Sequence, residues 1–167
     1  KVKDQVPPSF VTKTATGSMS GDGTLAAPFV FNVDHLSCNL TNTVLNCTGT
    51  ANISVTAEDE CTNNQNMHFH WKLDLYSNGT IDQTSVTNVS SAQLLLSNLP
   101  IGDHKVTFYV QDACGNYESC DVYFRIRDKK KPTPVCIGAL TTTLNPTTSS
   151  VTLWASDFEQ GSSCDNC

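Results

Sequence analysis

Hydrophobic and polar residues alternate along two neighbouring segments, 105–111 and 120–127. Their apolar side chains occupy every second position and are Val106, Phe108 and Val110 in the first segment and Cys120, Val122, Phe124 and Ile126 in the second. A period of two is typical of half-buried β-strands. A turn with Gly115 and Asn116 separates the segments, which predicts an antiparallel hairpin. Because an isolated hairpin is marginally stable in water, we expect its apolar face to pack on a second sheet.

Shorter segments with strand-like sequences supply the rest of the predicted architecture. The first, residues 10–14, follows Pro7 and Pro8 and is expected at a sheet edge, because proline cannot donate to a central ladder. Three consecutive leucines at 94–96 predict a short buried strand. The other predicted strands cover residues 29–33, 53–57 and 68–76. Short strands at this spacing are typical of a β-sandwich.

The segment 68–76 predicts two faces of different character. The apolar face would carry Phe69, Trp71, Leu73 and Leu75, and the polar face would carry His68, His70, Lys72 and Asp74. Trp71 is therefore predicted to lie at the centre of the core. The Ser-Asn-Gly-Thr sequence at 77–80 predicts a hairpin-type turn after this strand.

Composition favours an all-β fold and excludes several classes of partner. Ser, Thr and Asn are abundant and only 16% of the residues are charged, which suits strands and turns better than long helices. The net charge of −6 argues against binding to nucleic acid or anionic lipid, since both require clustered Lys and Arg. The basic run 129–131 adjoins prolines and is interpreted as a solvated linker. No apolar run is long enough for membrane insertion.

Two internal similarities predict tandem modules. Residues 1–8 resemble 125–134, where a strand end runs into a proline-containing linker, and residues 58–61 resemble 164–167. Because the similarities occur in the same order, we expect 1–3 to end a preceding module, 4–127 to form a complete module and 128–167 to begin another. An insertion at about 38–50 distinguishes the complete copy.

The expected fold is an immunoglobulin-like antiparallel β-sandwich stabilised by disulfides. The spacing of 106 residues between Cys61 and Cys167 is the size of one such domain. Eight cysteines without a pair of zinc-type Cys-x-x-Cys knuckles indicate disulfides and an oxidising, extracellular location. These cysteines are Cys38, Cys47, Cys61, Cys114, Cys120, Cys136, Cys164 and Cys167.

Several disulfide pairings are compatible with the spacing of these cysteines. A Cys38–Cys47 bridge would close the insertion, and a Cys136–Cys164 bridge would close the partial module. A Cys114–Cys120 bridge would span the hairpin turn, whereas the alternative joins Cys61 to Cys114 across two loops. Each bridge would contribute about 2–4 kcal/mol to stability.

A set of motifs points to a known family. The motifs are Val55-x-Ala57-x-Asp59-x-Cys61, Leu99-Pro-x-Gly102, Val106-x-Phe108-x-Val110-x-Asp112, Gly115-Asn116 and Cys120-x-Val-x-Phe124. Together they resemble the hyalin-repeat (HYR) family of Ig-like modules, especially the tandem copies on surface proteins of Bacteroidetes-type bacteria. The resemblance covers about residues 50–167. It implies a secreted, repeated adhesion or stalk module without chemistry of its own.

The chain departs from the family pattern in two places. Phe10 occupies the position where the later copy has Cys136, and the 38–50 insertion has no counterpart. The resemblance implies a bridge between the first-strand and last-strand cysteines. Because Phe10 cannot form that bridge, the partner of Cys120 stays open.

Two groups of side chains have the residue types of a metal site. His68 and His70 share a strand face at a spacing that suits a transition metal, although a plain solvated face is the alternative. Glu58, Asp59 and Glu60 end a predicted strand and are expected near Asp112 in the hairpin turn. Such oxygen clusters suit Ca²⁺ between Ig-like modules, and solvated turn acids are the alternative.

The sequence contains no nucleophile elbow, metalloprotease helix or phosphate-binding glycine loop, so we do not expect an enzyme. The expected function is that of a non-catalytic structural or adhesive module in a long cell-surface adhesin, stalk or filament. Its partners would be neighbouring modules of the same chain, or further copies that self-associate into fibres through exposed strand edges.

Two other functions are compatible with the sequence. In a carbohydrate-binding accessory module of a secreted enzyme, exposed aromatic side chains would form a row that stacks on surface glycans. The candidates are Tyr76, Tyr109, Tyr117 and Trp154. An inert spacer is the third alternative.

Overall fold

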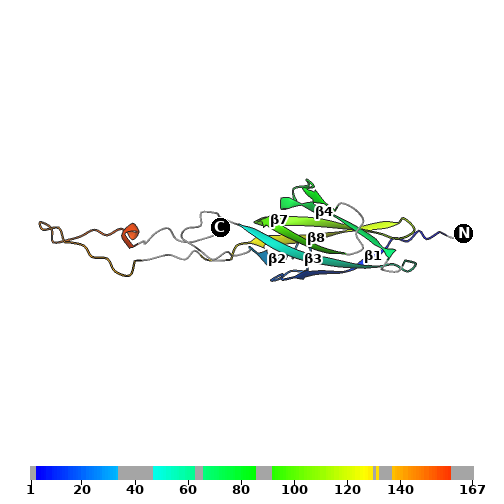
Figure 1. The fold of residues 1–167 in the computed structure, drawn as a ribbon, viewed down its shortest axis with the longest axis horizontal. Helices are drawn as coiled ribbons and strands as arrows, with labels where there is room; N and C mark the ends of the chain where they lie inside the picture. Colours follow the sequence, from blue (N-terminus) through cyan, green and yellow to red (C-terminus); the bar gives the residue numbers. More distant parts are fainter. Residues whose placement is uncertain are drawn as a thin grey trace. The chain divides into compact units, whose positions relative to one another are not determined.

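A computed structural model describes residues 3–33, 47–62, 66–85, 92–129, 131 and 137–158. The chain divides into two compact units. The first contains the described residues up to Asp128, and the second contains the described residues from Lys129 onward. The named strands all belong to the first unit, whose ribbon is drawn in Figure 1. Among the described residues, no helix has the length and apolar character needed to cross a membrane.

The described strands form two sheets. The three-stranded sheet has the order β1 (Ser9–Thr16), β3 (Thr48–Glu58) and β6 (Gln93–Pro100). The five-stranded sheet has the order β2 (Phe29–Asn32), β8 (Tyr117–Arg127), β7 (Gly102–Gln111), β4 (His68–Asp74) and β5 (Gln83–Thr84). Two short 3₁₀ segments complete the regular structure, η2 (Leu75–Ser77) and η3 (Ala155–Phe158). The predictions of an all-β fold and of two sheets are confirmed.

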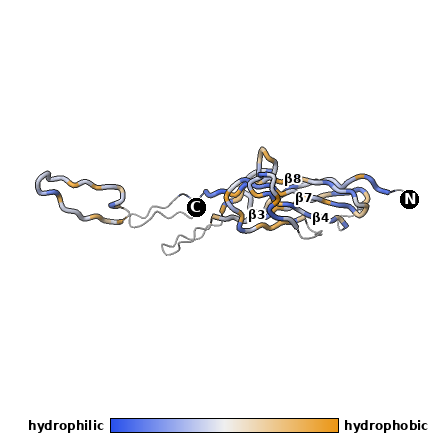
Figure 2. The backbone as a smooth tube through the Cα atoms, turned by 90° about the horizontal axis from the view of Figure 1, so that it is seen from above, coloured by the Kyte–Doolittle hydropathy of each residue, from blue (hydrophilic) through white to orange (hydrophobic). Residues whose placement is uncertain are grey.

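The predicted hairpin forms the centre of the larger sheet. β7 and β8 pair antiparallel, with Val106 opposite Val122 and Phe108 opposite Cys120. The alternating apolar side chains of both strands point inward, and Phe124 is fully buried. Figure 2 shows hydrophobic positions distributed along the strands rather than gathered in one segment. Period-two patterning therefore builds the core from side chains of many strands.

β2 is held against the hairpin in a way that no local pattern predicts. It runs parallel to β8, with Phe29 opposite Phe124, whereas the other paired strands described are antiparallel. The Phe31 ring meets the Phe124 ring edge to face at a centroid distance of 6.4 Å. Just before this pairing, the carbonyl of Gly23 accepts a hydrogen bond from the Tyr123 N–H at 2.9 Å. The loop that precedes β2 thus extends the contact along β8.

The predicted segment 68–76 is shorter in the structure. Phe69 and Leu73 are buried and His68 is exposed, as expected, but one residue of the polar face is not. β4 ends at Asp74, which is buried although the pattern placed it on the polar face. Its carboxylate accepts hydrogen bonds from the N–H groups of Asn78 and Gly79, both at 2.9 Å. These hydrogen bonds compensate for the burial of the carboxylate. Through them, Asp74 holds the turn that leads to β5.

Two predictions about the core were wrong. Trp71 is only partly buried and packs against the core rather than at its centre. It lies on β4, which is next to the two-residue edge strand β5. In β6, Leu94 and Leu96 are buried but Leu95 is 67% exposed. β6 is the edge of its sheet and buries one face, so its leucines alternate.

Candidate functional site

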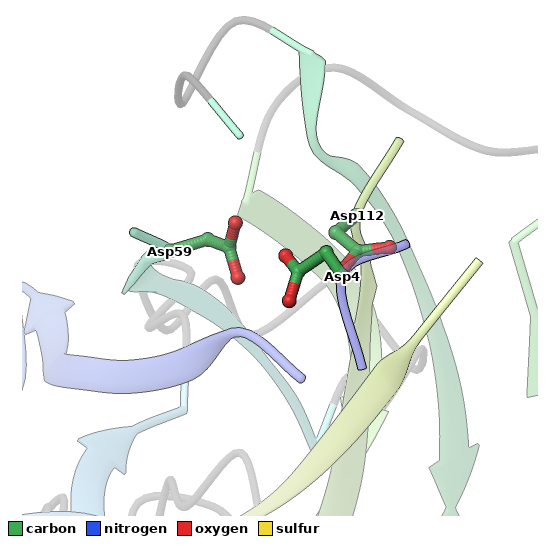
Figure 3. A group of neighbouring side chains, drawn as sticks. All are labelled: Asp4, Asp59 and Asp112. Atoms are coloured by element: carbon green, nitrogen blue, oxygen red, sulfur yellow. The ribbon is translucent and has the colours of Figure 1, made fainter. Parts of the chain in front are cut away.

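Three aspartates from distant parts of the chain meet at one end of the first unit. Asp4 precedes β1, Asp59 follows β3 and Asp112 follows β7. Antiparallel pairing of β1 with β3 places Ser9 opposite Glu58, so the start of β1 and the end of β3 lie together. Figure 3 shows the carboxylate of Asp4 between those of Asp59 and Asp112. One oxygen from each lies within 4.8 Å of the other two. We call this group the aspartate cluster.

Asp112 is the most buried member, with 3% of its surface exposed. Its Oδ1 accepts the N–H groups of Cys114 and Asn116 at 2.8 Å, and its Oδ2 accepts the Asn116 side-chain amide at 2.7 Å. Burial raises the pKa of the Asp112 carboxyl, but the hydrogen bonds from Asn116 and Cys114 outweigh it and leave the pKa below its ordinary value of 3.8. Asp112 is therefore charged at neutral pH and fixes the β7–β8 turn.

Asn116 also fastens the segment that leads into β1. Its side-chain amide donates to the carbonyl oxygens of Asp4 and Val6, each at 3.3 Å. The two bonds join residues more than a hundred positions apart in the sequence. The entry segment is thereby held on the β7–β8 turn, and Asp4 is brought to Asp112.

Asp59 is oriented by the loop that follows β3. Its Oδ1 accepts the N–H groups of Cys61 at 3.0 Å and Thr62 at 2.6 Å. Glu58 and Glu60 are exposed and do not join the aspartate cluster. A hollow of about 370 Å³ adjoins the cluster at Asp59 and is lined by Val6, Pro7, Ser9, Glu58, Asp59 and Glu60.

Asp4 is the member that sequence analysis missed. Its Oδ1 accepts the N–H of Val6 at 3.0 Å. Its Oδ2 has less than 1 Å² exposed and accepts no hydrogen bond. The similarity between residues 1–8 and 125–134 was the available signal, since Asp4 corresponds to Asp128 in that comparison. Sequence cannot show that an entry segment folds back onto a hairpin turn.

The aspartate cluster carries uncompensated negative charge. None of its carboxylates forms an ion pair with a cationic side chain among the residues that the structure describes. The negative charge of Asp4, with smaller contributions from Asp59 and Glu60, raises the pKa of the nearby Cys61 thiol above its ordinary value of 9.0. The cluster therefore has a negative potential that an added cation would relieve.

The candidate metal-binding histidines, His68 and His70, both lie on β4. The imidazole of His70 stacks on the Tyr109 ring at 4.5 Å with an interplanar angle of 3°, and Lys72 lies over the same ring. Burial and then the charge of Lys72 lower the pKa of His70. His68 is exposed, and neither histidine belongs to a group of three ligand atoms among the described residues. Asp74, expected on this face, is buried in the turn instead.

The described cysteines do not form the expected bridges. Cys61, Cys114 and Cys120 are free, so neither Cys114–Cys120 nor Cys61–Cys114 is present. Cys120 lies opposite Phe108 within the ladder, whereas Cys114 lies in the turn, so the hairpin does not pair them. The pairings Cys38–Cys47 and Cys136–Cys164 each include residues outside the described ranges, and so do the remaining candidates in 164–167.

The candidate tyrosines of the first unit lie on three elements, η2, β7 and β8. Tyr76 in η2 packs near the His104 ring at 5.5 Å, and Tyr109 is covered by His70 on β4. Tyr117 is 71% exposed at the start of β8. Trp154 belongs to the second unit.

The sequence was compared with family models and with curated proteins. No family model matches it, and no curated protein matches it.

Proposed function

We propose that the chain is a non-catalytic structural or adhesive segment of a long, secreted cell-surface protein built from immunoglobulin-like modules. The observation that carries this proposal is the position of the chain's entry and exit in the first unit. The entry segment is bound to the β7–β8 turn through Asn116. β8 begins at that turn and ends at Arg127, and its eleven residues span about 35 Å as an extended strand.

Entry and exit at opposite ends suit a module that is joined in line to others. A chain of such modules extends by one module length with each copy, as a stalk or filament requires. The internal similarities of residues 1–8 with 125–134 and of 58–61 with 164–167 are consistent with successive copies.

The strand order supports an immunoglobulin-like topology. β1, β3 and β6 correspond to strands A, B and E of one sheet, and β8, β7 and β4 correspond to G, F and C of the other. The parallel contact of β2 with β8 suits a first strand that crosses between sheets. A resemblance to HYR-type repeats belongs to the same proposal and rests on the motifs of residues 50–167.

The absence of a catalytic motif in the sequence supports a mechanical role. Sheet pairing and core packing would resist extension, and contacts would be made with adjoining modules or with further copies of the chain. The exposed outer strands β1 and β6 offer edges for such contacts.

The proposal is tested on the parent protein in its own cells. An antibody raised against the 167-residue chain should label intact cells, and mild protease treatment of intact cells should remove the label. Electron microscopy of the purified parent should show an elongated particle. Labelling only after lysis, or a compact globular particle, would contradict the proposal. An antibody to a cytoplasmic protein is the control for cell integrity.

A further inference from the structure

The aspartate cluster contains a feature that acidic surface groups ordinarily lack. Oδ2 of Asp4 is buried, with less than 1 Å² exposed, and accepts no hydrogen bond. A buried carboxylate oxygen without a partner is costly, because it loses hydration and gains nothing in return. Figure 3 shows this carboxylate between Asp59 and Asp112, so the unsatisfied group lies inside the cluster.

We propose that Asp4, Asp59 and Asp112 bind a divalent cation, Ca²⁺, which fastens the entry segment to the end of the first unit. The cation takes the place of the missing partner of Asp4 Oδ2. It also neutralises carboxylates that have no cationic side chain beside them in the described part of the chain.

The geometry suits calcium. Ca²⁺ binds oxygen ligands at about 2.3–2.6 Å, so oxygens on opposite sides of the ion are about 4.6–5.2 Å apart. The three carboxylate oxygens lie within 4.8 Å of one another. All three are hard oxygen ligands, and no His or Cys belongs to the group, which favours Ca²⁺ over Zn²⁺ or Cu²⁺. Water can complete the coordination from the adjoining hollow at Asp59.

The sequence repeats two of the three ligands independently. Asp128 corresponds to Asp4 when residues 125–128 are compared with residues 1–4. Asp165 corresponds to Asp59 when residues 164–167 are compared with residues 58–61. A site that uses an entry segment and a strand end would recur at each junction of a repeated protein.

The proposal does not depend on the cellular role, because it concerns a site within the first unit. Calorimetric titration of the chelator-treated 167-residue chain with CaCl₂ should give a binding event with a dissociation constant on the order of 10⁻⁴–10⁻³ M, the range of extracellular modules. Ca²⁺ should also raise the melting temperature, and a chelator should reverse the rise. MgCl₂ at the same concentration should give a smaller rise.

The variants Asp4→Asn and Asp59→Asn test the ligands. Asparagine keeps one oxygen to accept the N–H groups that Oδ1 of each residue accepts now, so both variants should fold. Each should bind Ca²⁺ at least tenfold more weakly and lose the calcium-dependent rise in melting temperature. Asp22→Asn is the matched control, because Asp22 accepts the Thr24 N–H in a similar turn outside the cluster. It should respond like the unmodified chain.

Two results would overturn the proposal. One is the absence of binding and of any melting shift at 10-fold the upper end of that range of concentration, about 10⁻² M. The other is an unchanged calcium response in both Asp4→Asn and Asp59→Asn. Neither result would bear on the location of the parent protein, so the two proposals fail separately.

Discussion

Buried polar side chains in the first unit hold turns in place. Asp74, His104 and Asp112 are each at most 3% exposed, and each hydrogen-bonds backbone groups of a nearby turn. His104 Nδ1 accepts the Tyr76 N–H at 3.1 Å, and its Nε2 lies 2.9 Å from the Pro100 carbonyl. The neutral ring with its proton on Nε2 satisfies both contacts, because it then accepts at Nδ1 and donates at Nε2.

Removing the Asp74 carboxylate should destabilise the turn after β4. Asp74→Ala leaves the N–H groups of Asn78 and Gly79 without their acceptor, and hydrogen bonds to charged groups contribute about 1.5–3 kcal/mol each. We expect a loss of about 2–4 kcal/mol in the free energy of unfolding, measured by urea denaturation. Asp74→Asn keeps one acceptor oxygen and should lose less. Equal stability of both variants and the native chain would contradict this role.

Stability should fall on mild acidification because of two histidines. Burial lowers the pKa of His104 below its ordinary value of 6.5, although the Pro100 carbonyl and the charges of Asp103, Asp74 and Asp82 oppose the shift. Burial and Lys72 lower the pKa of His70 in the same direction. The unfolded chain therefore binds protons below about pH 6.5 that the folded chain does not bind, and the free energy of unfolding falls as the pH decreases through that value.

The measurement is the urea midpoint at pH 7.5 and pH 5.5, where most carboxyl groups stay ionised. The double variant His70→Gln/His104→Gln cannot take up these protons. Its urea midpoint should therefore fall less between pH 7.5 and pH 5.5 than that of the native chain. His68→Gln, at an exposed position on the same strand, is the control and should keep the native fall. An identical fall in the native chain and the double variant would exclude the two histidines as its source.

At the scale of elements, the loop before β2 decides how the first part of the chain meets the hairpin. Gly21 and Gly23 both have positive φ angles, of 97° and 81°. A Cβ atom on Gly21 would lie 2.0 Å from the Pro28 carbonyl oxygen, and one on Gly23 would lie 2.6 Å from the Phe29 ring. The close approach of the Pro28 backbone at Gly21 and of the Phe29 and Val122 side chains at Gly23 leaves no room for a Cβ atom where the loop leads into β2.

Gly21 and Gly17 form a matched pair for testing this loop. Both have positive φ, but a Cβ atom on Gly17 meets nothing within 4 Å. Gly17→Ala should lower the free energy of unfolding by about 1–2 kcal/mol, which is the cost of placing a side chain on a left-handed backbone. Gly21→Ala adds a clash with the Pro28 backbone and should lower the free energy of unfolding clearly more than Gly17→Ala does. Its melting temperature should lie several degrees below that of Gly17→Ala. Equal losses would show that the close contact with Pro28 does not matter.

At the scale of the whole molecule, the two units differ in burial. The first unit has a continuous core drawn from both sheets. In the second unit, no described residue is buried, and Trp154 is 70% exposed. Stability is therefore distributed unevenly along the chain, because buried apolar area is the main source of folding free energy.

Limited proteolysis should reveal this difference. Chymotrypsin at low concentration should cleave first within residues 137–158, at Trp154, Phe158 or the leucines, and leave a resistant fragment that includes the first unit. Mass spectrometry would identify the cleavage sites. Phe108 and Phe124 on the hairpin are the internal reference, since both are buried in the core. Cleavage at these two residues as early as at Trp154 would contradict the prediction.

The sequence by itself determined the strands of the hairpin, their inward-facing residues and the all-β class, because period-two alternation is a local property that survives in the folded chain. Only the tertiary structure decided which strands pair and which side chains meet. The parallel contact of β2 with β8, the partial exposure of Trp71 and the approach of Asp4 to Asp112 all depend on contacts between distant residues. No short-range pattern encodes such contacts, since they are set by how the sheets stack and where the loops return.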